Sequence, residues 1–190
     1  MNIKRSYTIL VMVCAISLLL VHAGVAVAST LDDEYRHDII FSNHYNGTSY
    51  YTNSYIYWDD ASSTFSSFSE LPTIGAIGNV ASDINADGYT DVVFANFYDN
   101  NTKKLNSYIY WGDATGSLST VTGLPTSGAV GLSAGDLNGD GKMDLVFGNQ
   151  SNNTTVLLNS YIYWGDATDS YTVKTGLPTS YAHGTSIADV

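Results

Sequence analysis

Two short stretches of the chain place oxygen-bearing side chains at alternate positions. Residues 83–91 read Asp-Ile-Asn-Ala-Asp-Gly-Tyr-Thr-Asp, and residues 136–144 read Asp-Leu-Asn-Gly-Asp-Gly-Lys-Met-Asp. Both fit the pattern D-x-N-x-D-G-x-x-D. Ca²⁺ is a hard cation that takes about 6–8 oxygen ligands, and oxygens at positions 1, 3 and 5 let a tight loop wrap around one ion. The spacing therefore predicts one calcium site in each stretch.

Each position of the pattern has a chemical role. Positions 1, 3, 5 and 9 supply side-chain oxygens, the glycine at position 6 permits a sharp turn, and position 7 offers its backbone carbonyl. The predicted ligands are Asp83, Asn85, Asp87, Tyr89 and Asp91 in the first stretch, and Asp136, Asn138, Asp140, Lys142 and Asp144 in the second.

An ion-free turn is the alternative, because Asp, Asn and Gly are common turn formers. Three carboxylates in one small loop would then repel each other, and the pattern occurs twice at one register, which favours a cation. An EF-hand is excluded, because that motif needs a glutamate at position 12 and a following helix. Here Phe94 and Phe147 occupy position 12 and a β-prone run follows. A dockerin module is excluded on the same two grounds.

The elements that position these stretches repeat every 53 residues. Asn-Ser-Tyr-Ile-Tyr-Trp begins at Asn53, Asn106 and Asn159. Leu-Pro-Thr keeps the same spacing, and the same register relates Asp38, Asp91 and Asp144, and likewise Asp83, Asp136 and Asp189. A fixed period of this size is typical of repeat architectures such as propellers, whose blades usually take about 40–50 residues.

Each period predicts four short β-strands, at 91–96, 107–111, 119–122 and 128–135 in the middle copy. In residues 54–58, Tyr55 and Tyr57 point to one face of a strand, and Ile56 and Trp58 point to the other. Both faces are apolar, as expected for a blade that is covered by neighbouring blades on both sides. The predicted fold class is an all-β propeller with about three blades of four antiparallel strands.

The segments 44–52, 97–105 and 150–158 differ most among the copies. A constant frame with variable loops is how repeat folds build binding surfaces, although drift in unconstrained loops gives the same pattern. The aromatic residues of these loops are candidate sugar contacts, namely Tyr45, Tyr50, Tyr51, Phe97 and Tyr98.

Residues 1–28 are predicted to be a secretory signal peptide. Lys4 and Arg5 precede an apolar run over 9–21, and the small residues at 26–28 predict cleavage before Ser29. A membrane anchor and a lipoprotein anchor at Cys14 are the alternatives. Cys14 is the only cysteine, so the mature chain has no disulfide and depends on its core or on metal.

The charge of the chain excludes two classes of partner. The net charge is −11, and loss of Lys4 and Arg5 with the leader makes it more negative by a further two units. Nucleic acids and anionic membranes both require basic patches. We therefore expect no nucleic-acid partner. We also expect no transmembrane span after cleavage of the leader, because the apolar run over 9–21 leaves with it.

The two acidic stretches run into Asp-Val-Val-Phe and Asp-Leu-Val-Phe-Gly, and aromatic strands follow at a fixed period. In this the chain resembles the FG-GAP/VCBS repeat family, whose members form integrin-alpha-like β-propellers. The resemblance implies calcium in the hairpin loop that joins the first two strands of a blade.

Three features of the sequence depart from the pattern of the family. Residues 32–38 lack the glycine and the alternating oxygens, only Phe147-Gly148 matches the FG-GAP signature, and Asp189-Val190 begin a further loop.

Two domains are therefore expected, the signal peptide at 1–28 and FG-GAP/VCBS-type repeats at 29–190, cut within the next repeat's calcium loop. Closed propellers have about 4–8 blades, so the repeats are expected to be part of a larger closed propeller.

The sequence favours a secreted or cell-surface module for binding or adhesion, with structural calcium and an extracellular protein or glycan as the ligand. No G-x-S-x-G, H-E-x-x-H or P-loop motif occurs, so we expect no enzyme activity. The propeller part of an extracellular carbohydrate-active enzyme and a purely structural surface-layer element are the alternatives.

Overall fold

The computed structural model describes residues 37–60 and 64–189. The predicted signal peptide and most of the altered first loop lie outside these residues. Within them the chain forms β-strands and no helix, and hence no helix long and apolar enough to cross a membrane. The strands are β1 (Ile39–Phe41), β2 (Tyr51–Trp58), β3 (Ser67–Ile74), β4 (Ala76–Ser82), β5 (Asp91–Asn96), β6 (Asn106–Trp111), β7 (Thr120–Pro125), β8 (Ala129–Gly135), β9 (Asp144–Asn149), β10 (Leu157–Tyr163) and β11 (Lys174–Ser180).

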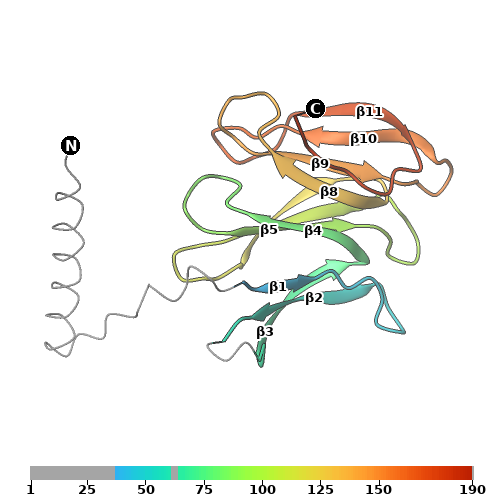
Figure 1. Ribbon diagram of the computed structural model, residues 1–190. Helices are drawn as coiled ribbons and strands as arrows, with labels where there is room; N and C mark the ends of the chain where they lie inside the picture. Colours follow the sequence, from blue (N-terminus) through green and yellow to red (C-terminus); the bar gives the residue numbers. More distant parts are fainter. Residues whose placement is uncertain (1–36, 61–63, 190) are drawn as a thin grey trace, which may run out of the picture. The chain divides into compact units, whose positions relative to one another are not determined.

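The strands form three antiparallel sheets that pack face to face (Figure 1). We call the sheet β1-β2-β3 blade 1, the sheet β4-β5-β6-β7 blade 2 and the sheet β8-β9-β10-β11 blade 3. In every blade each strand pairs with the next strand in sequence. The prediction of an all-β fold built from four-stranded antiparallel blades is confirmed, with three strands described in blade 1.

The strands of the middle copy lie close to their predicted positions. The predicted run 91–96 coincides with β5, and 107–111 lies within β6. The weak run at 119–122 belongs to β7, which continues to Pro125 because Leu124 is buried beneath blade 3. Residues 128–135 contain β8.

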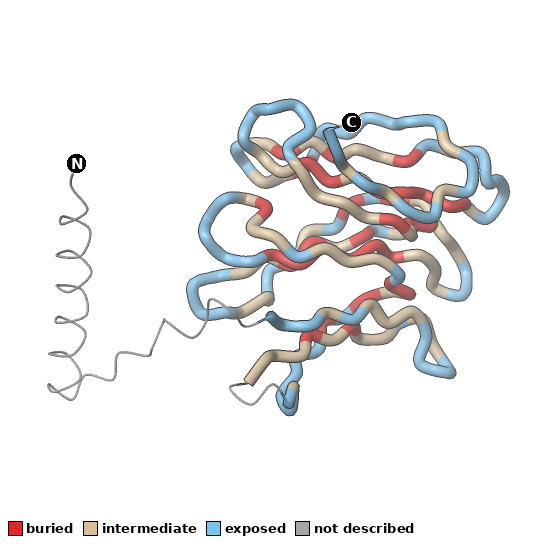
Figure 2. Tube along the Cα trace, in the orientation of Figure 1, coloured by how far each residue is buried: buried red, intermediate tan, exposed pale blue. Residues whose placement is uncertain are grey.

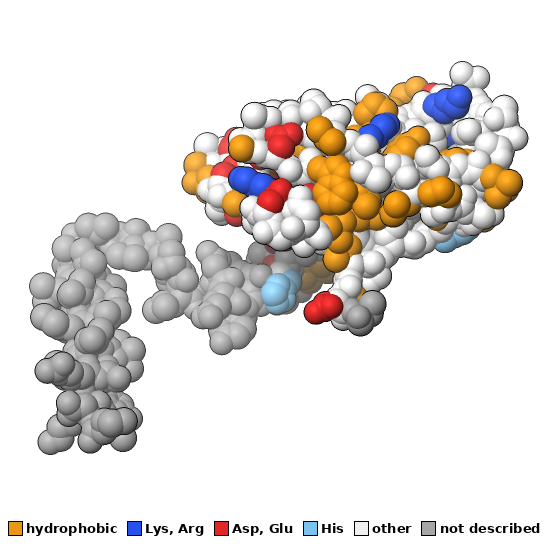
Figure 3. All heavy atoms as spheres, turned by 90° about the horizontal axis from the view of Figure 1, so that it is seen from above, with side chains coloured by type: hydrophobic (Ala, Val, Ile, Leu, Met, Phe, Trp, Pro, Cys, Tyr) orange, Lys and Arg blue, Asp and Glu red, His pale blue; other side chains and the backbone are white. Residues whose placement is uncertain are grey.

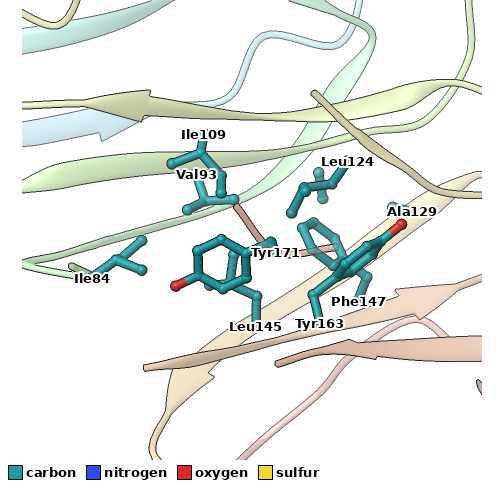
Figure 4. Close-up of a cluster of buried hydrophobic side chains, with 10 residues drawn as sticks. Ile84, Val93, Ile109, Leu124, Ala129, Leu145, Phe147, Tyr163 and Tyr171 are labelled. Atoms are coloured by element: carbon teal, nitrogen blue, oxygen red, sulfur yellow. The ribbon is translucent and has the colours of Figure 1, made fainter. Parts of the chain in front are cut away.

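The core lies in two layers between the blades, as the buried segments in Figure 2 show. Between blades 1 and 2, Ile56 and Leu71 pack against Val92, Phe94 and Tyr110. Between blades 2 and 3 the repeat-equivalent residues form a second cluster, which includes Ile109, Leu124, Leu145, Phe147 and Tyr163 (Figure 4). Tyr110 and Tyr163 lie in the layer shared with the preceding blade, and Ile56 and Ile109 lie in the layer shared with the next blade. The prediction that both faces of a blade are apolar is confirmed.

The first strands of the blades approach each other closely. A Cβ atom on Gly78 of β4 would lie 2.6 Å from the carbonyl oxygen of Val130 in β8. A Cβ atom on Gly131 would lie 2.9 Å from the carbonyl carbon of Gly184. The segment 182–189 therefore lies against β8 much as β8 lies against β4, and only glycine fits at these contacts.

Tyrosine hydroxyls also join the blades. Tyr110 donates to the carbonyl oxygen of Pro72 in blade 1 at 2.5 Å, and Tyr163 donates to that of Pro125 in blade 2 at 2.5 Å. Burial raises the pKa of Tyr110 and of Tyr163 to about 12. Both hydroxyls therefore keep their proton at neutral pH and remain donors.

A buried asparagine forms a second link between blades. The Oδ1 atom of Asn96 accepts from the N–H of Ile74 in blade 1 at 3.2 Å, while its Nδ2 atom donates to the carbonyl of Asn106 at 2.8 Å. Asn149 repeats both bonds one period later, with Ser127 and Asn159. Neither asparagine is exposed. These asparagines share the 53-residue register but are not among the predicted site residues.

Candidate functional site

The two acidic stretches form hairpin loops at the same end of their blades. Residues 83–90 connect β4 to β5, and residues 136–143 connect β8 to β9, which are the first two strands of their blades (Figure 1). We call them cation loop 1 and cation loop 2. In Figure 3 acidic side chains gather at one end of the molecule.

Hydrogen bonds to backbone N–H groups shape cation loop 1. The two oxygens of Asp83 accept from the N–H groups of Asp87 (3.0 Å) and Gly88 (2.9 Å). The Oδ1 atom of Asn85 also accepts from Asp87, at 3.1 Å. Asp87 in turn accepts from the N–H of Tyr89 at 2.9 Å. The side chains at positions 1, 3 and 5 thus face the inside of the turn.

Cation loop 2 repeats this scheme. Asp136 accepts from Asp140 (3.2 Å) and Gly141 (2.8 Å). Asn138 accepts from Asp140 at 2.9 Å, and Asp140 accepts from the N–H of Lys142 at 2.8 Å. Hydrogen bonds from backbone N–H groups, above all from that of Gly141, hold the pKa of Asp136 below its ordinary value. The carboxylate is therefore charged at neutral pH.

The aspartate at position 9 lies beneath each loop. Asp91 has no exposed surface, and its oxygens accept from the N–H groups of Ile84 and Gly112, each at 2.8 Å. Burial raises the pKa of Asp91 although both N–H donors oppose the shift. Two hydrogen bonds thus do not fully offset the desolvation of this carboxylate, and a nearby cation would offset more of it.

Asp144 makes the same two bonds one period later, with Leu137 and Gly165, each at 2.9 Å. In blade 1, Asp38 accepts from the N–H of Asp59 at 2.9 Å, although the residues before it do not fit the loop pattern. The aspartate that recurs every 53 residues therefore links the start of one strand to the end of the next strand by a hydrogen bond, with or without a preceding cation loop.

The residues of each cation loop fit a hard cation by their chemistry. Each loop, with the aspartate beneath it, offers three carboxylates and one amide oxygen, and a carboxylate has about four lone-pair sites, of which one or two are used in the bonds above. Within residues 37–60 and 64–189, no three His, Cys, Asp or Glu side chains are grouped as ligands of one ion. Positions 1, 3 and 5 of each loop lie in one turn with position 9 beneath it, and calcium binding by the predicted ligands stays a prediction.

The backbone of the cation loops is left-handed at two positions. Gly88 and Gly141, at position 6, have φ of +93° and +83°, as their turn role requires. Position 4 is also left-handed, with φ of +63° at Ala86 and +77° at Gly139. Position 4, where the two loops differ, is not among the predicted ligand positions.

We expect opposite effects from exchanging the residues at position 4. A non-glycine residue in the left-handed region costs roughly 1–2 kcal/mol. Gly139→Ala is therefore expected to lower the free energy of unfolding by about 1 kcal/mol, and no atom within 4 Å of the new Cβ adds a clash. Ala86→Gly is expected to raise it by about 0.5 kcal/mol, since the freer unfolded chain offsets part of the gain. Urea unfolding of both variants measures this, and effects of the same sign would contradict it.

The variable segments lie at the opposite end of the blades, because they follow β1, β5 and β9 whereas the cation loops precede β5 and β9. Five aromatic rings of blades 1 and 2 are in contact there. The ring centroids are 5.0 Å apart for His44 and Tyr50, 4.8 Å for Tyr45 and Tyr50, 5.0 Å for Tyr50 and Tyr98, and 5.7 Å for His44 and Phe97. We call these residues the aromatic cluster.

The variable segments of neighbouring blades also bond to each other. Tyr51 donates to a carboxylate oxygen of Asp99 at 3.3 Å. The side chain of Asn153 accepts from the N–H of Lys103 at 2.9 Å and donates to the carbonyl of Asn101 at 2.7 Å. Of the five predicted sugar contacts, four belong to the aromatic cluster, and Tyr51 is 61% exposed beside it.

Comparison with known families agrees with this architecture. Residues 83–147, from the start of cation loop 1 into β9, match the model of the FG-GAP-like repeat family. No curated protein and no solved structure matched the chain. Repeats of this family are typical of extracellular modules for binding that are built as propellers.

Proposed function

We propose that this chain, which carries an FG-GAP-like repeat, is a secreted or cell-surface binding module whose cation loops hold structural calcium. The end of the blades with the cation loops then contributes stability, and the opposite end, with the aromatic cluster, recognises the ligand. Calcium would be held by the side chains at positions 1, 3, 5 and 9, and by the carbonyl oxygens of Tyr89 and Lys142. When bound, the ion would neutralise carboxylates that otherwise repel one another.

The aromatic cluster is the single observation that carries the binding role. Its rings come from two blades, and Tyr45 is 49% exposed. Lys103 lies 4.6 Å from the centroid of Phe97, at the border of the cluster. Ligand sites are typically lined by aromatic side chains with a few polar groups that fix orientation.

A glycan is the ligand that this chemistry favours. The face of an aromatic ring is electron-rich and attracts polarised C–H groups, which a sugar presents on its apolar side. Asn, Asp and Thr side chains next to the rings can hydrogen-bond hydroxyl groups. The strongly acidic chain makes a nucleic acid or an anionic membrane a poor partner for the same surface.

We expect the calcium-loaded protein to bind members of a glycan array, and Tyr45→Ala to weaken that binding about tenfold, equivalent to about 1.4 kcal/mol for a lost ring contact. Tyr89→Ala is the matched control, because Tyr89 is 41% exposed at the opposite end and keeps its backbone carbonyl. Equal losses in both variants would place the ligand elsewhere.

The alternatives predict other results on the same array. A purely structural surface-layer element would bind no glycan. The propeller part of a carbohydrate-active enzyme would bind one class of polysaccharide, and the residues that cleave it would lie outside the described blades. We propose no catalytic role for the described residues.

A further inference from the structure

Charge is distributed unequally between the two ends of the blades. The loops at the end with the cation loops join β2 to β3, β4 to β5, β6 to β7, β8 to β9 and β10 to β11. The aspartates in the described parts of these loops are Asp59, Asp60, Asp83, Asp87, Asp113, Asp136, Asp140, Asp166 and Asp169. At the opposite end, the variable segments 44–52, 97–105 and 150–158 carry Asp99 alone among acidic residues, together with Lys103 and Lys104. The aromatic cluster therefore lies at the end that is poor in acidic side chains.

The two ends are far enough apart for solvent to screen one from the other. A strand rises about 3.3 Å per residue, so the length of β5 or β6 separates the ends by roughly 20 Å. The Debye length is about 8 Å at physiological ionic strength. The Oδ1 atom of Asp99 already accepts from the N–H groups of Asn101 at 2.8 Å and Thr102 at 2.7 Å. With two lysines against this one carboxylate, the surface beside the aromatic cluster is locally positive.

Lys103 is held in a defined position beside the aromatic cluster. Its Nζ atom lies over the ring of Phe97 and donates to the Oγ atom of Ser151 at 2.6 Å. Ser151 follows β9 in blade 3 and is 3% exposed. The backbone is fixed as well, because the carbonyl of Lys103 accepts from the N–H of Gly128 at 2.5 Å. The ammonium group therefore lies at the junction of blades 2 and 3, and Phe97 connects it to the rings of the cluster.

The equivalents of Lys103 in the other blades carry no charge. They are Tyr50 and Val156, one period before and after it. The contact of Lys103 with Phe97 repeats that of Tyr50 with His44, so the fold accepts an uncharged side chain at this position. In the described blades, Lys103 forms no ion pair with a carboxylate. An ammonium group has three N–H donors, of which the serine hydroxyl takes one, so the others are available to an anionic group of a ligand.

We propose that the ligand at this end of the blades is an acidic glycan, a sugar chain that carries carboxylate or sulfate groups. The apolar face of a sugar unit packs on the aromatic cluster, and an anionic group of the chain binds the Nζ atom of Lys103. This inference rests on the proposed glycan-binding function and names the class of glycan. A charge-assisted hydrogen bond is stronger than one between neutral groups, so Lys103 distinguishes acidic glycans from neutral ones. Two lysines do not form the extended basic patch that a nucleic acid needs, but one ammonium group suffices for one carboxylate or sulfate.

An array of paired oligosaccharides tests the class of ligand. Each uronate-containing member is printed beside its carboxyl-reduced form, and each sulfated member beside its desulfated form, so that the members of a pair differ in charge. We expect the calcium-loaded protein to bind the acidic member about tenfold more tightly than its neutral partner. The two kinds of pair show whether carboxylate or sulfate is recognised. Equal binding within the pairs would overturn this inference and leave the glycan-binding function standing, whereas binding to no member would overturn both.

Variants of Lys103 test the contact itself. Lys103→Met keeps the apolar stem and removes the charge, so it is expected to weaken binding of the acidic member about tenfold and to leave binding of the neutral partner unchanged. Lys103→Arg keeps the charge and is expected to retain the preference for the acidic member. Added salt should likewise weaken binding of the acidic member more than that of the neutral one. If Lys103→Met kept the full preference, Lys103 would not be the anion contact.

Lys174→Met is the matched control. The Nζ atom of Lys174 lies 4.2 Å from the ring centroid of Tyr161, so this variant removes the same charge and the same kind of ring contact. Lys174 begins β11, at the end of the blades with the cation loops. The variant is expected to bind acidic glycans like the unmodified protein. Circular dichroism of all three variants checks that each keeps its β-sheet fold. Equal losses in Lys103→Met and Lys174→Met would mean that net charge rather than position decides binding, and would refute the assignment of Lys103.

Discussion

Removal of calcium is expected to lower the melting temperature of the protein by roughly 10–20 °C. An ion that binds only the folded chain adds about 2.7 kcal/mol at 100-fold excess over Kd, so two sites add about 5 kcal/mol. For a domain of this size each kcal/mol shifts the melting temperature by about 2–4 °C. The physical reason is that Asp83 and Asp87, or their equivalents, carry like charges in one short turn above the buried carboxylate of Asp91.

The experiment compares thermal unfolding in excess calcium with unfolding in chelator, together with calorimetric titration of a stripped sample. The titration is expected to count two ions, and Asp87→Ala and Asp140→Ala should each remove one. In the double variant, calcium should no longer change the melting temperature. A count of zero would refute the cation loops as calcium sites. An unchanged melting temperature with ions bound would instead refute their structural role.

Asn96→Asp is expected to lower the free energy of unfolding by roughly 3 kcal/mol. The two side chains have nearly the same shape, but a carboxylate cannot donate to the carbonyl of Asn106, which lies 2.8 Å from the Nδ2 atom of Asn96. The substitution therefore places a buried charge against a carbonyl oxygen. The loss should shrink as the pH falls through the raised pKa of the buried carboxyl, and it should be smallest below about pH 4, where the protonated carboxyl can donate again.

Urea unfolding at neutral and acidic pH measures this effect. Asn100→Asp is the matched control, because Asn100 is exposed in the following loop and its φ of +84° suits Asn and Asp alike. Its expected change is within about 0.5 kcal/mol, as for most surface substitutions. A loss at Asn96 no larger than that at Asn100 would mean that the asparagine link contributes little to the contact between blades.

The strands were predictable because each one is a short run of β-prone residues in the sequence. The aromatic strand beginning at Asn106 has apolar residues on both faces, and its copies confirm the period. The resemblance to FG-GAP/VCBS repeats also placed both cation loops between the first two strands of a blade. These features depend on residues that are neighbours along the chain.

The contacts between blades were not predictable, because they join residues about one period apart. Nothing local shows that Tyr110 donates to Pro72, or that Asn96 accepts from Ile74. The aspartate at position 9 was assigned to calcium alone, whereas Asp91 also binds the N–H of Gly112. The recurrence of Asp38 where the loop pattern is missing was the one available sign of this second role.

The consecutive strand order has a consequence for how the chain folds. Every strand pairs with its neighbour in sequence, as Val93 does with Ile109 and Ile109 with Thr122. Only short loops must close before these pairs form, so the entropic cost of each closure is small. During synthesis from the N-terminus, a blade can complete its own pairing before the next blade has left the ribosome. The later step is then the stacking of finished sheets, and errors at that step would exchange whole blades between neighbouring molecules.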